Sequence, residues 1–143
     1  MPSKSAVPSA FRELFVMLPA QVQELALSAR QLVLTALPDA VELPDPKAHL
    51  VGYGYGTGYK DVVATLILSK TGVKIGLAHG ASLPDPAALL RGAGKVHRHI
   101  DVRTQEQLRR AEVKQLLDAA LSAWRRRTKE ATANKLRKGR QCP

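Results

Sequence analysis

Residues 62–79 read VVATLILSKTGVKIGLAH, and this stretch decides the fold. Its first part, Val62–Leu68, is a nearly continuous apolar run with several β-branched residues, which predicts a central strand. Residues 70–72, Lys-Thr-Gly, have the chemistry of a hairpin turn. Apolar residues then alternate with polar or small ones over residues 73–79, as in a strand with one buried face. The stretch therefore predicts an antiparallel hairpin around which a sheet can form.

Further strand segments lie on both sides of this hairpin. Residues 41–43 and 49–55 precede it, and residues 96–102 follow it. Glycines alternate through residues 52–58, but a strand follows them instead of a helix, which excludes a dinucleotide-binding loop. Between the hairpin and the last strand, the prolines of residues 84–90 favour a short helical turn.

Helical periodicity marks the two ends of the chain. Apolar residues at helical spacing predict one or two turns over residues 11–18 and a longer helix over residues 20–37. Near the other end, Thr104 and Gln107 have the spacing of a capping box, at the start of a helix expected over residues 105–127. The order of elements predicts an α+β fold: an antiparallel sheet of about four to five strands, flanked by N-terminal helices and one long C-terminal helix.

The length of 143 residues and the hydrophobic content of 45% suit a single domain with a real core. We expect a flexible leader over residues 1–9, one domain over residues 10–127, and a basic, disordered tail over residues 128–143. The chain has no apolar stretch near the roughly 20 residues that a membrane span needs. Its single cysteine, Cys142, fits a reducing compartment and is expected to be functionally idle. The expected localisation is cytoplasmic.

Positive charge is concentrated near the C-terminus. The chain carries a formal charge of +10, and residues 125–140 supply +7 of it through eight basic residues and one acid, Glu130. Such a segment attracts nucleic acid through counterion release, independently of base sequence, although a solubilising tail without a specific partner has the same composition. The candidate nucleic-acid contacts are Arg125, Arg126, Arg127, Lys129, Lys135, Arg137, Lys138 and Arg140.

A second candidate site lies in residues 89–100, which read LLRGAGKVHRHI. Glycines at a turn let the backbone approach a ligand closely, and an arginine can bind phosphate or carboxylate with two nitrogens. The alternative is a solvated turn and a charged edge strand. The candidate ligand-binding residues are Gly92, Gly94, Lys95, Arg98 and His99.

The sequence predicts no catalytic residues, no cofactor and no metal site. Candidates for a metal are His79, His97 and His99, because two histidines at i and i+2 can hold one ion. A durable zinc site needs three or four ligands. No nucleophile elbow is present, and the acidic residues are scattered among turns.

Residues 89–100 also resemble a bacterial family of unknown function, the YdhG-like domain (domain-of-unknown-function family 1801), whose members share the pattern G-x-G-K-x-x-R-H. The segment 18–32, which reads LPAQVQELALSARQL, and the hairpin end 75–80, which reads IGLAHG, are similar too. The resemblance covers about residues 10–125. It implies a compact α+β fold likened to frataxin, and it matches Gly92, Gly94, Lys95, Arg98 and His99 to the family pattern.

Three functions follow as expectations. The first is a non-enzymatic binding domain with a pocket for a small anion or ligand beside residues 92–99. The second is association with nucleic acid through the basic tail. The third, implied by relatives proposed as intracellular iron chaperones, is metal delivery. Frataxin-type iron binding uses an acidic ridge of oxygen ligands. The helix expected over residues 20–37 has only one acidic residue, Glu24.

Overall fold

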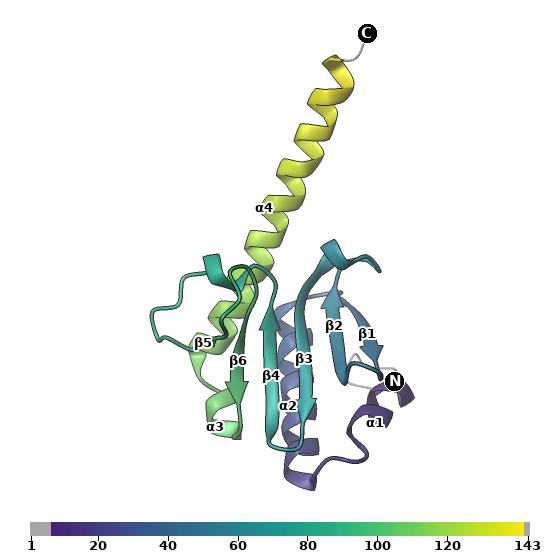
Figure 1. The fold of residues 1–143 in the computed structure, drawn as a ribbon, viewed down its shortest axis with the longest axis vertical. Coiled ribbons are helices and arrows are strands. Elements are labelled where there is room, and N and C mark those ends of the chain that lie inside the picture. The colour runs from purple at the N-terminus through teal and green to yellow at the C-terminus, as the bar shows by residue number, and fades with distance from the viewer. Residues whose placement is uncertain (1–6, 142–143) are drawn as a thin grey trace.

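The computed structural model describes residues 7–141, apart from the side chains of Tyr59 and residues 137–141. Its strands are β1 (Val41–Asp45), β2 (Leu50–Gly54), β3 (Val62–Ser69), β4 (Gly72–Leu77), β5 (Leu90–Arg91) and β6 (Arg98–Val102). They form one sheet in the order β1-β2-β3-β4-β6-β5, with every neighbouring pair antiparallel. Figure 1 shows this sheet in front of the helices.

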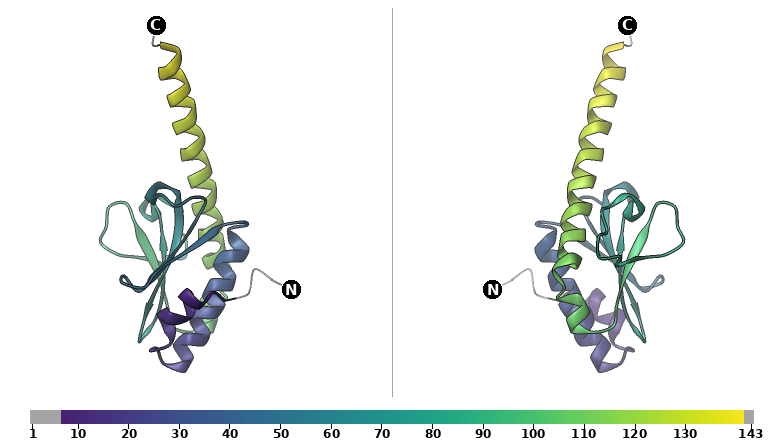
Figure 2. Two further views of the ribbon diagram at one scale, coloured as in Figure 1. Left: turned by 90° about the vertical axis from the view of Figure 1, so that its right-hand side faces the viewer. Right: turned by 90° about the vertical axis from the view of Figure 1, so that its left-hand side faces the viewer.

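The helices pack on one side of the sheet. They are α1 (Ser9–Phe15), α2 (Ala20–Ala36), α3 (Gln105–Leu108) and α4 (Ala111–Gln141), with short 3₁₀ turns η1 (Tyr59–Asp61) and η2 (Gly80–Ser82). Figure 2 shows α2 and the first half of α4 along one side of the sheet, and the second half of α4 projecting beyond it. The architecture is α+β, as the sequence predicts.

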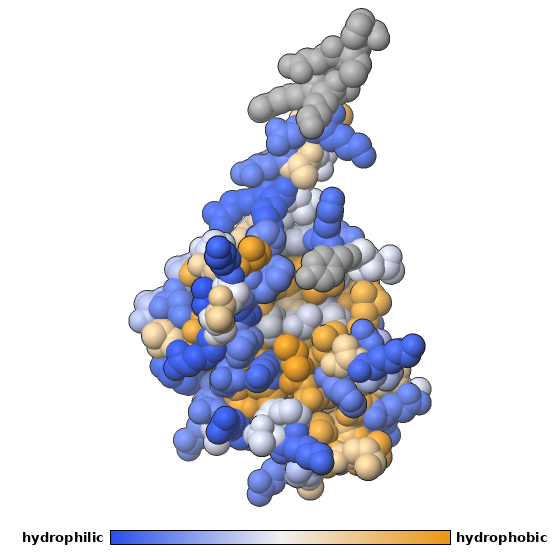
Figure 3. Space-filling model, viewed as in Figure 1, coloured by the Kyte–Doolittle hydropathy of each residue, from blue (hydrophilic) through white to orange (hydrophobic). Residues whose placement is uncertain are grey.

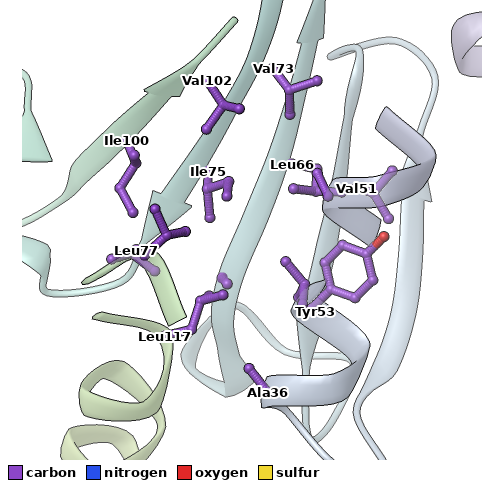
Figure 4. Close-up of a cluster of buried hydrophobic side chains, with 14 of the residues drawn as sticks. Ala36, Val51, Tyr53, Leu66, Val73, Ile75, Leu77, Ile100, Val102 and Leu117 are labelled. Atoms are coloured by element: carbon purple, nitrogen blue, oxygen red, sulfur yellow. The ribbon is translucent and has the colours of Figure 1, made fainter. Parts of the chain in front are cut away.

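The core fills the space between the sheet and α2 and α4. Antiparallel pairing places Leu66 opposite Ile75, and Ile75 opposite Ile100, so that one row of side chains crosses three strands. These three residues are buried, and Leu117 of α4 is buried with them, as Figure 4 shows. Burial of such side chains contributes about 1.5–3 kcal/mol each. The helices are therefore held to the sheet by this single apolar layer.

One polar cluster lies inside this layer. The Nε of Arg30 on α2 donates to Oε2 of Glu42 at 2.7 Å, and its Nη2 donates to Oε1 at 3.1 Å. The hydroxyl of Tyr53, opposite Glu42 in the sheet, donates to the same Oε2 at 2.6 Å. Burial, followed by the neighbouring Glu42, raises the pKa of Tyr53, which keeps its hydroxyl a donor. The guanidinium of Arg30 also lies over the ring of Phe11, so this cluster joins α1, α2, β1 and β2.

The sheet has six strands, slightly more than the four to five that the sequence suggests. The additional strand is β5, which has only two residues and pairs with β6. The helical turn expected over residues 84–90 is wrong. Both carboxylate oxygens of Asp85 accept hydrogen bonds, from the amides of Leu89 and Leu90 at 2.8 and 2.9 Å. An aspartate that bonds nearby amides in this way favours a loop over a helix.

The C-terminal helix begins where the sequence predicts and extends further. Thr104 accepts from the amide of Gln107, whose side chain accepts from the amide of Thr104, so the capping box is confirmed. The helix is then interrupted at residues 109–110 and restarts as α4. The sequence predicts a disordered tail from residue 128, whereas the backbone of α4 stays helical to Gln141.

The ends of the chain complete the comparison with the expected domain limits. The expected leader, residues 1–9, overlaps α1 at Ser9, and residues 1–6 lie outside the described part of the chain, as does Cys142. Within residues 7–141, no helix has both the length and the apolar character needed to cross a lipid bilayer.

Candidate functional site

The face of the sheet opposite the helices is open. No helix among residues 7–141 covers it (Figure 2). Along β3, Leu66 and Leu68 face the core, so Thr65 and Ile67 point to this open face, where both are partly exposed. Figure 3 views the molecule from this side and shows hydrophobic residues across the middle of the sheet. Apolar side chains on a face without a helix are a candidate ligand surface.

The open face is hollowed into a groove of about 820 Å³, which we call the sheet groove. This volume lies within the range of small-molecule sites, about 300–1,000 Å³. The floor includes Thr65 and Ile67 of β3. Ionisable residues lie at both ends: Asp45 of β1 and Lys47 just after it, and Arg98 and His99 on β6. The other lining residues are Leu43, Pro44, Pro46, Leu50, Gly52, Val62, Ala64, Gly76, Leu77, Ala78 and His97.

Two glycines keep the floor of the sheet groove low. A Cβ at Gly76 would lie 2.3 Å from Oγ1 of Thr65 on the neighbouring strand, which is too close. At Gly52 a Cβ would meet Leu43 and Val62 at 3.8 Å, which is an ordinary contact. Position 76 therefore requires glycine beside the present Thr65, whereas position 52 accepts a side chain that would fill the groove.

The structure brings only part of the expected anion pocket into the sheet groove. Arg98 and His99 line it, whereas Lys95 and Gly94 are exposed in the preceding loop and do not. Gly92 lies in the same loop but close to β6, since a Cβ there would lie 3.5 Å from the His99 ring. Its φ of 116° is one that glycine adopts readily. The loop thus positions Arg98 and His99 and keeps Lys95 in solvent.

Only some of the hydrogen-bond donors of the Arg98 guanidinium have an acceptor among the described residues. Its Nη1 donates to the carbonyl of Gly92, while its buried Nε has no hydrogen-bond partner among the described residues. Beside it, Nε2 of His99 lies 3.5 Å from Oδ1 of Asp101. A buried donor without a partner is rare in folded proteins and is a reason to look for a ligand. In β6 the His99 side chain lies on the open face beside Gly76, whereas Arg98 pairs with the core residue Leu77 and holds the Gly92 loop, so an anionic group at this end of the sheet groove would meet His99 first and Arg98 at the edge.

The three candidate metal ligands do not form a common site. Nδ1 of His97 accepts a hydrogen bond from the amide of His79 at 3.1 Å, so a neutral His97 ring carries its proton on Nε2. Ligation through either nitrogen would disturb this arrangement. His99 instead pairs with Asp101. Among the described residues, no three His, Cys, Asp or Glu side chains gather closely enough to hold a metal ion.

The candidate nucleic-acid contacts lie on the projecting half of α4. Ala123 is the last described residue of this helix that is buried, and Arg125, Arg126 and Lys129 beyond it are exposed. Arg127 is half-buried. Lys135 is exposed, and the side chains of Arg137, Lys138 and Arg140 lie outside the described part of the chain. The helical backbone spreads these residues around an axis instead of along a loose tail.

Sequence reasoning missed the floor of the sheet groove and the internal cluster around Arg30. A signal for each is present in the sequence. Residues 62–68 are apolar on both faces of the strand, although helices are expected on only one side of the sheet. Arg30 interrupts the apolar stripe of α2 between Ala26 and Val33, which places a charge on the buried side of the helix.

Comparisons with protein-family models, with curated proteins and with solved structures find no match for this chain.

Proposed function

We propose that this protein is a non-enzymatic binding module whose sheet groove holds a small ligand with an apolar body and an anionic group. The observation that carries the proposal is the groove itself, a cavity of about 820 Å³ with an apolar floor and with Arg98 and His99 at one end. An apolar body would cover Ile67 and Leu43 and remove their surface from water, which is favourable. The anionic group would lie at the β6 end.

Arg98 is the residue on which recognition of the anion would depend most. It is partly buried, and its Nε lacks a partner within the described residues, so a carboxylate or phosphate oxygen would satisfy it after a small movement of the side chain. His99 can add a second donor, and it carries a positive charge when protonated. Lys95 lies outside the sheet groove and contributes only to the general positive field.

Decanoate, a carboxylate with a long apolar chain, tests this proposal. We expect it to shift the amide resonances of β2, β3, β4 and β6 in an NMR titration, and acetate, which lacks the apolar body, to bind far more weakly. Replacing Arg98 by glutamine is expected to lower the decanoate affinity about tenfold, because one charge-assisted hydrogen bond is lost. Lys95→Gln removes the same charge from the neighbouring loop and is expected to change the affinity less than twofold.

A second variant separates binding from folding. Gly52→Val adds a side chain where a Cβ meets only ordinary contacts, so the fold is expected to persist while the sheet groove is partly filled. Binding should then fall while the circular dichroism spectrum stays unchanged. Equal affinity for decanoate in Gly52→Val, Arg98→Gln and the original chain would show that the ligand binds elsewhere.

We also infer that the chain is a YdhG-like protein. Support comes from the α+β architecture and from the arrangement of the motif residues, since a Cβ at Gly92 would lie 3.5 Å from the His99 ring and 3.8 Å from Cδ of Arg98. Metal delivery, by contrast, gains no support from the described residues, because they hold no cluster of three ligands.

Nucleic-acid binding through α4 is a second candidate function. The observation that favours it is the projection of residues 125–141 as a helix, which at about 1.5 Å per residue extends about 25 Å. A basic helix of this kind can lie along a phosphate backbone without contact from the rest of the domain.

The salt dependence of DNA binding tests this second candidate. Replacing Lys129, Lys138 and Arg140 by glutamine is expected to reduce the slope of log affinity against log salt by about 2 to 3, since each phosphate contact contributes about 0.9. The control replaces Lys70, Lys74 and Lys95, which are exposed on the domain body, and should leave the slope nearly unchanged. Equal losses in the two variants would mean that only net charge matters.

A further inference from the structure

A second cavity lies beside the sheet groove, between α4 and the loops at one end of the sheet. It measures about 620 Å³, and we call it the helix cleft. Val62, Ala78 and His97 line both cavities, whereas Arg98 and His99 line only the sheet groove. The helix cleft is large enough for a small molecule and not only for an inorganic ion.

Positively charged residues from separate parts of the chain line the helix cleft. Lys60 comes from η1, and Arg127 and Lys135 come from α4. Asp61 is the one acid among the described lining residues, so the permanent charges give a net +2. The side chains of these three cations form no hydrogen bond or ion pair with any residue that the structure describes. Cations that line a hollow in excess over acids, and that form no ion pair, leave a positive potential there.

Two histidines complete the wall of the helix cleft. The rings of His79 and His97 meet edge to face with centroids 5.8 Å apart, and the amide of His79 donates to Nδ1 of His97. Partial burial, followed by electrostatic interactions with Arg127 and then His97, lowers the pKa of His79. A nearby anion would act in the opposite direction, because it favours the protonated ring.

We propose that the helix cleft binds the phosphate group of a small phosphomonoester. Lys60, Arg127 and Lys135 supply the charge that a phosphate dianion requires, and the His79 ring supplies an additional donor. The organic part of the ligand would lie against Val96 and Trp124, which line the same cavity. The monoester is favoured over a nucleic-acid backbone because a net +2 matches a dianion, whereas each backbone phosphodiester carries a single charge.

Phenyl phosphate is the probe, titrated into the full chain at constant ionic strength and followed by NMR. We expect it to shift the imidazole resonances of His79 and to raise the pKa of this histidine, while His49, which lies outside the helix cleft, is unaffected. Arg127→Gln is expected to lower the affinity about tenfold. Arg126→Gln removes the same charge from the next position on α4, outside the cavity, and should change the affinity less than twofold.

A second variant, His79→Asn, and a second probe, dimethyl phosphate, also test the phosphate site. His79 has a left-handed backbone with φ of 56°, which asparagine adopts more readily than most residues, so His79→Asn should fold and should weaken binding at pH 6 more than at pH 8. Equal effects of Arg126→Gln and Arg127→Gln would overturn the proposal, as would equal affinity for dimethyl phosphate, a diester monoanion. Arg98→Gln should leave the phenyl phosphate response of the His79 resonances unchanged, so this readout is independent of the sheet groove.

Discussion

Replacing Glu42 by leucine is expected to lower the free energy of unfolding by about 3 to 5 kcal/mol. The side chains of Arg30 and Glu42 are only 5% and 11% exposed, so the ion pair between them is largely shielded from water. Without Glu42, the buried guanidinium loses its carboxylate, and the Tyr53 hydroxyl loses its acceptor. A buried charge without its partner is strongly destabilising. Urea unfolding followed by circular dichroism measures the change.

The matched control removes both charges together. The double variant Arg30→Met, Glu42→Leu is expected to be more stable than Glu42→Leu alone, because no buried charge is left behind. A double variant that is less stable than the single one would mean that Arg30 stabilises the fold mainly through other contacts, such as the ring of Phe11.

The same cluster predicts a loss of stability in alkali. The pKa of Tyr53 is raised in the folded protein, so above about pH 10 the unfolded chain loses this proton while the folded chain keeps it. The contribution of the Tyr53 proton to stability is therefore fully present below about pH 10 and is lost as the pH rises further. Tyr53→Phe should show a smaller alkaline decline than the original chain, and an identical decline would assign the effect to other groups.

Replacing Leu117 by alanine is expected to lower the free energy of unfolding by about 2 to 5 kcal/mol. Leu117 is fully buried between α4 and the sheet (Figure 4), so its removal leaves a cavity in the layer that joins them. The same substitution at Leu136, on the same helix but 61% exposed, is expected to change stability by less than about 0.5 kcal/mol. Both variants are measured by urea unfolding.

This pair of variants also reports on the projecting half of α4. A large loss at Leu136 would indicate that a contact outside the described arrangement, such as a second copy of the chain, covers that part of the helix. A small loss at Leu117 would mean that α4 is held to the domain mainly by its other buried residues, among them Leu121.

Much of the fold could be predicted from the sequence because the decisive patterns are local. Apolar alternation over residues 73–79 set the inner face of β4, and the spacing of Thr104 and Gln107 set the start of the C-terminal helix. The prediction of a helical turn over residues 84–90 failed because the hydrogen bonds of one side chain set the backbone conformation there. The carboxylate of Asp85 binds two amides and replaces the expected helical turn, and no pattern of apolar residues reveals such a bond.

The candidate sites depended more on tertiary structure. From the sequence, residues 92–99 form a single cationic motif, yet folding separates them: Arg98 and His99 line the sheet groove, while Lys95 remains in solvent. The helix cleft combines Lys60 with Arg127, which are distant in the chain, and only the packing of α4 against the end of the sheet brings them together.

By itself, the sequence determined the α+β class, the limits of most strands and the cationic character of residues 92–99 and 125–140. Residue type and local periodicity specify these properties. Tertiary structure alone decided which face of the sheet stays open, which charges face a cavity and which one is buried against Glu42. These outcomes depend on pairing between strands and on helix packing, which bring together residues that no local pattern connects.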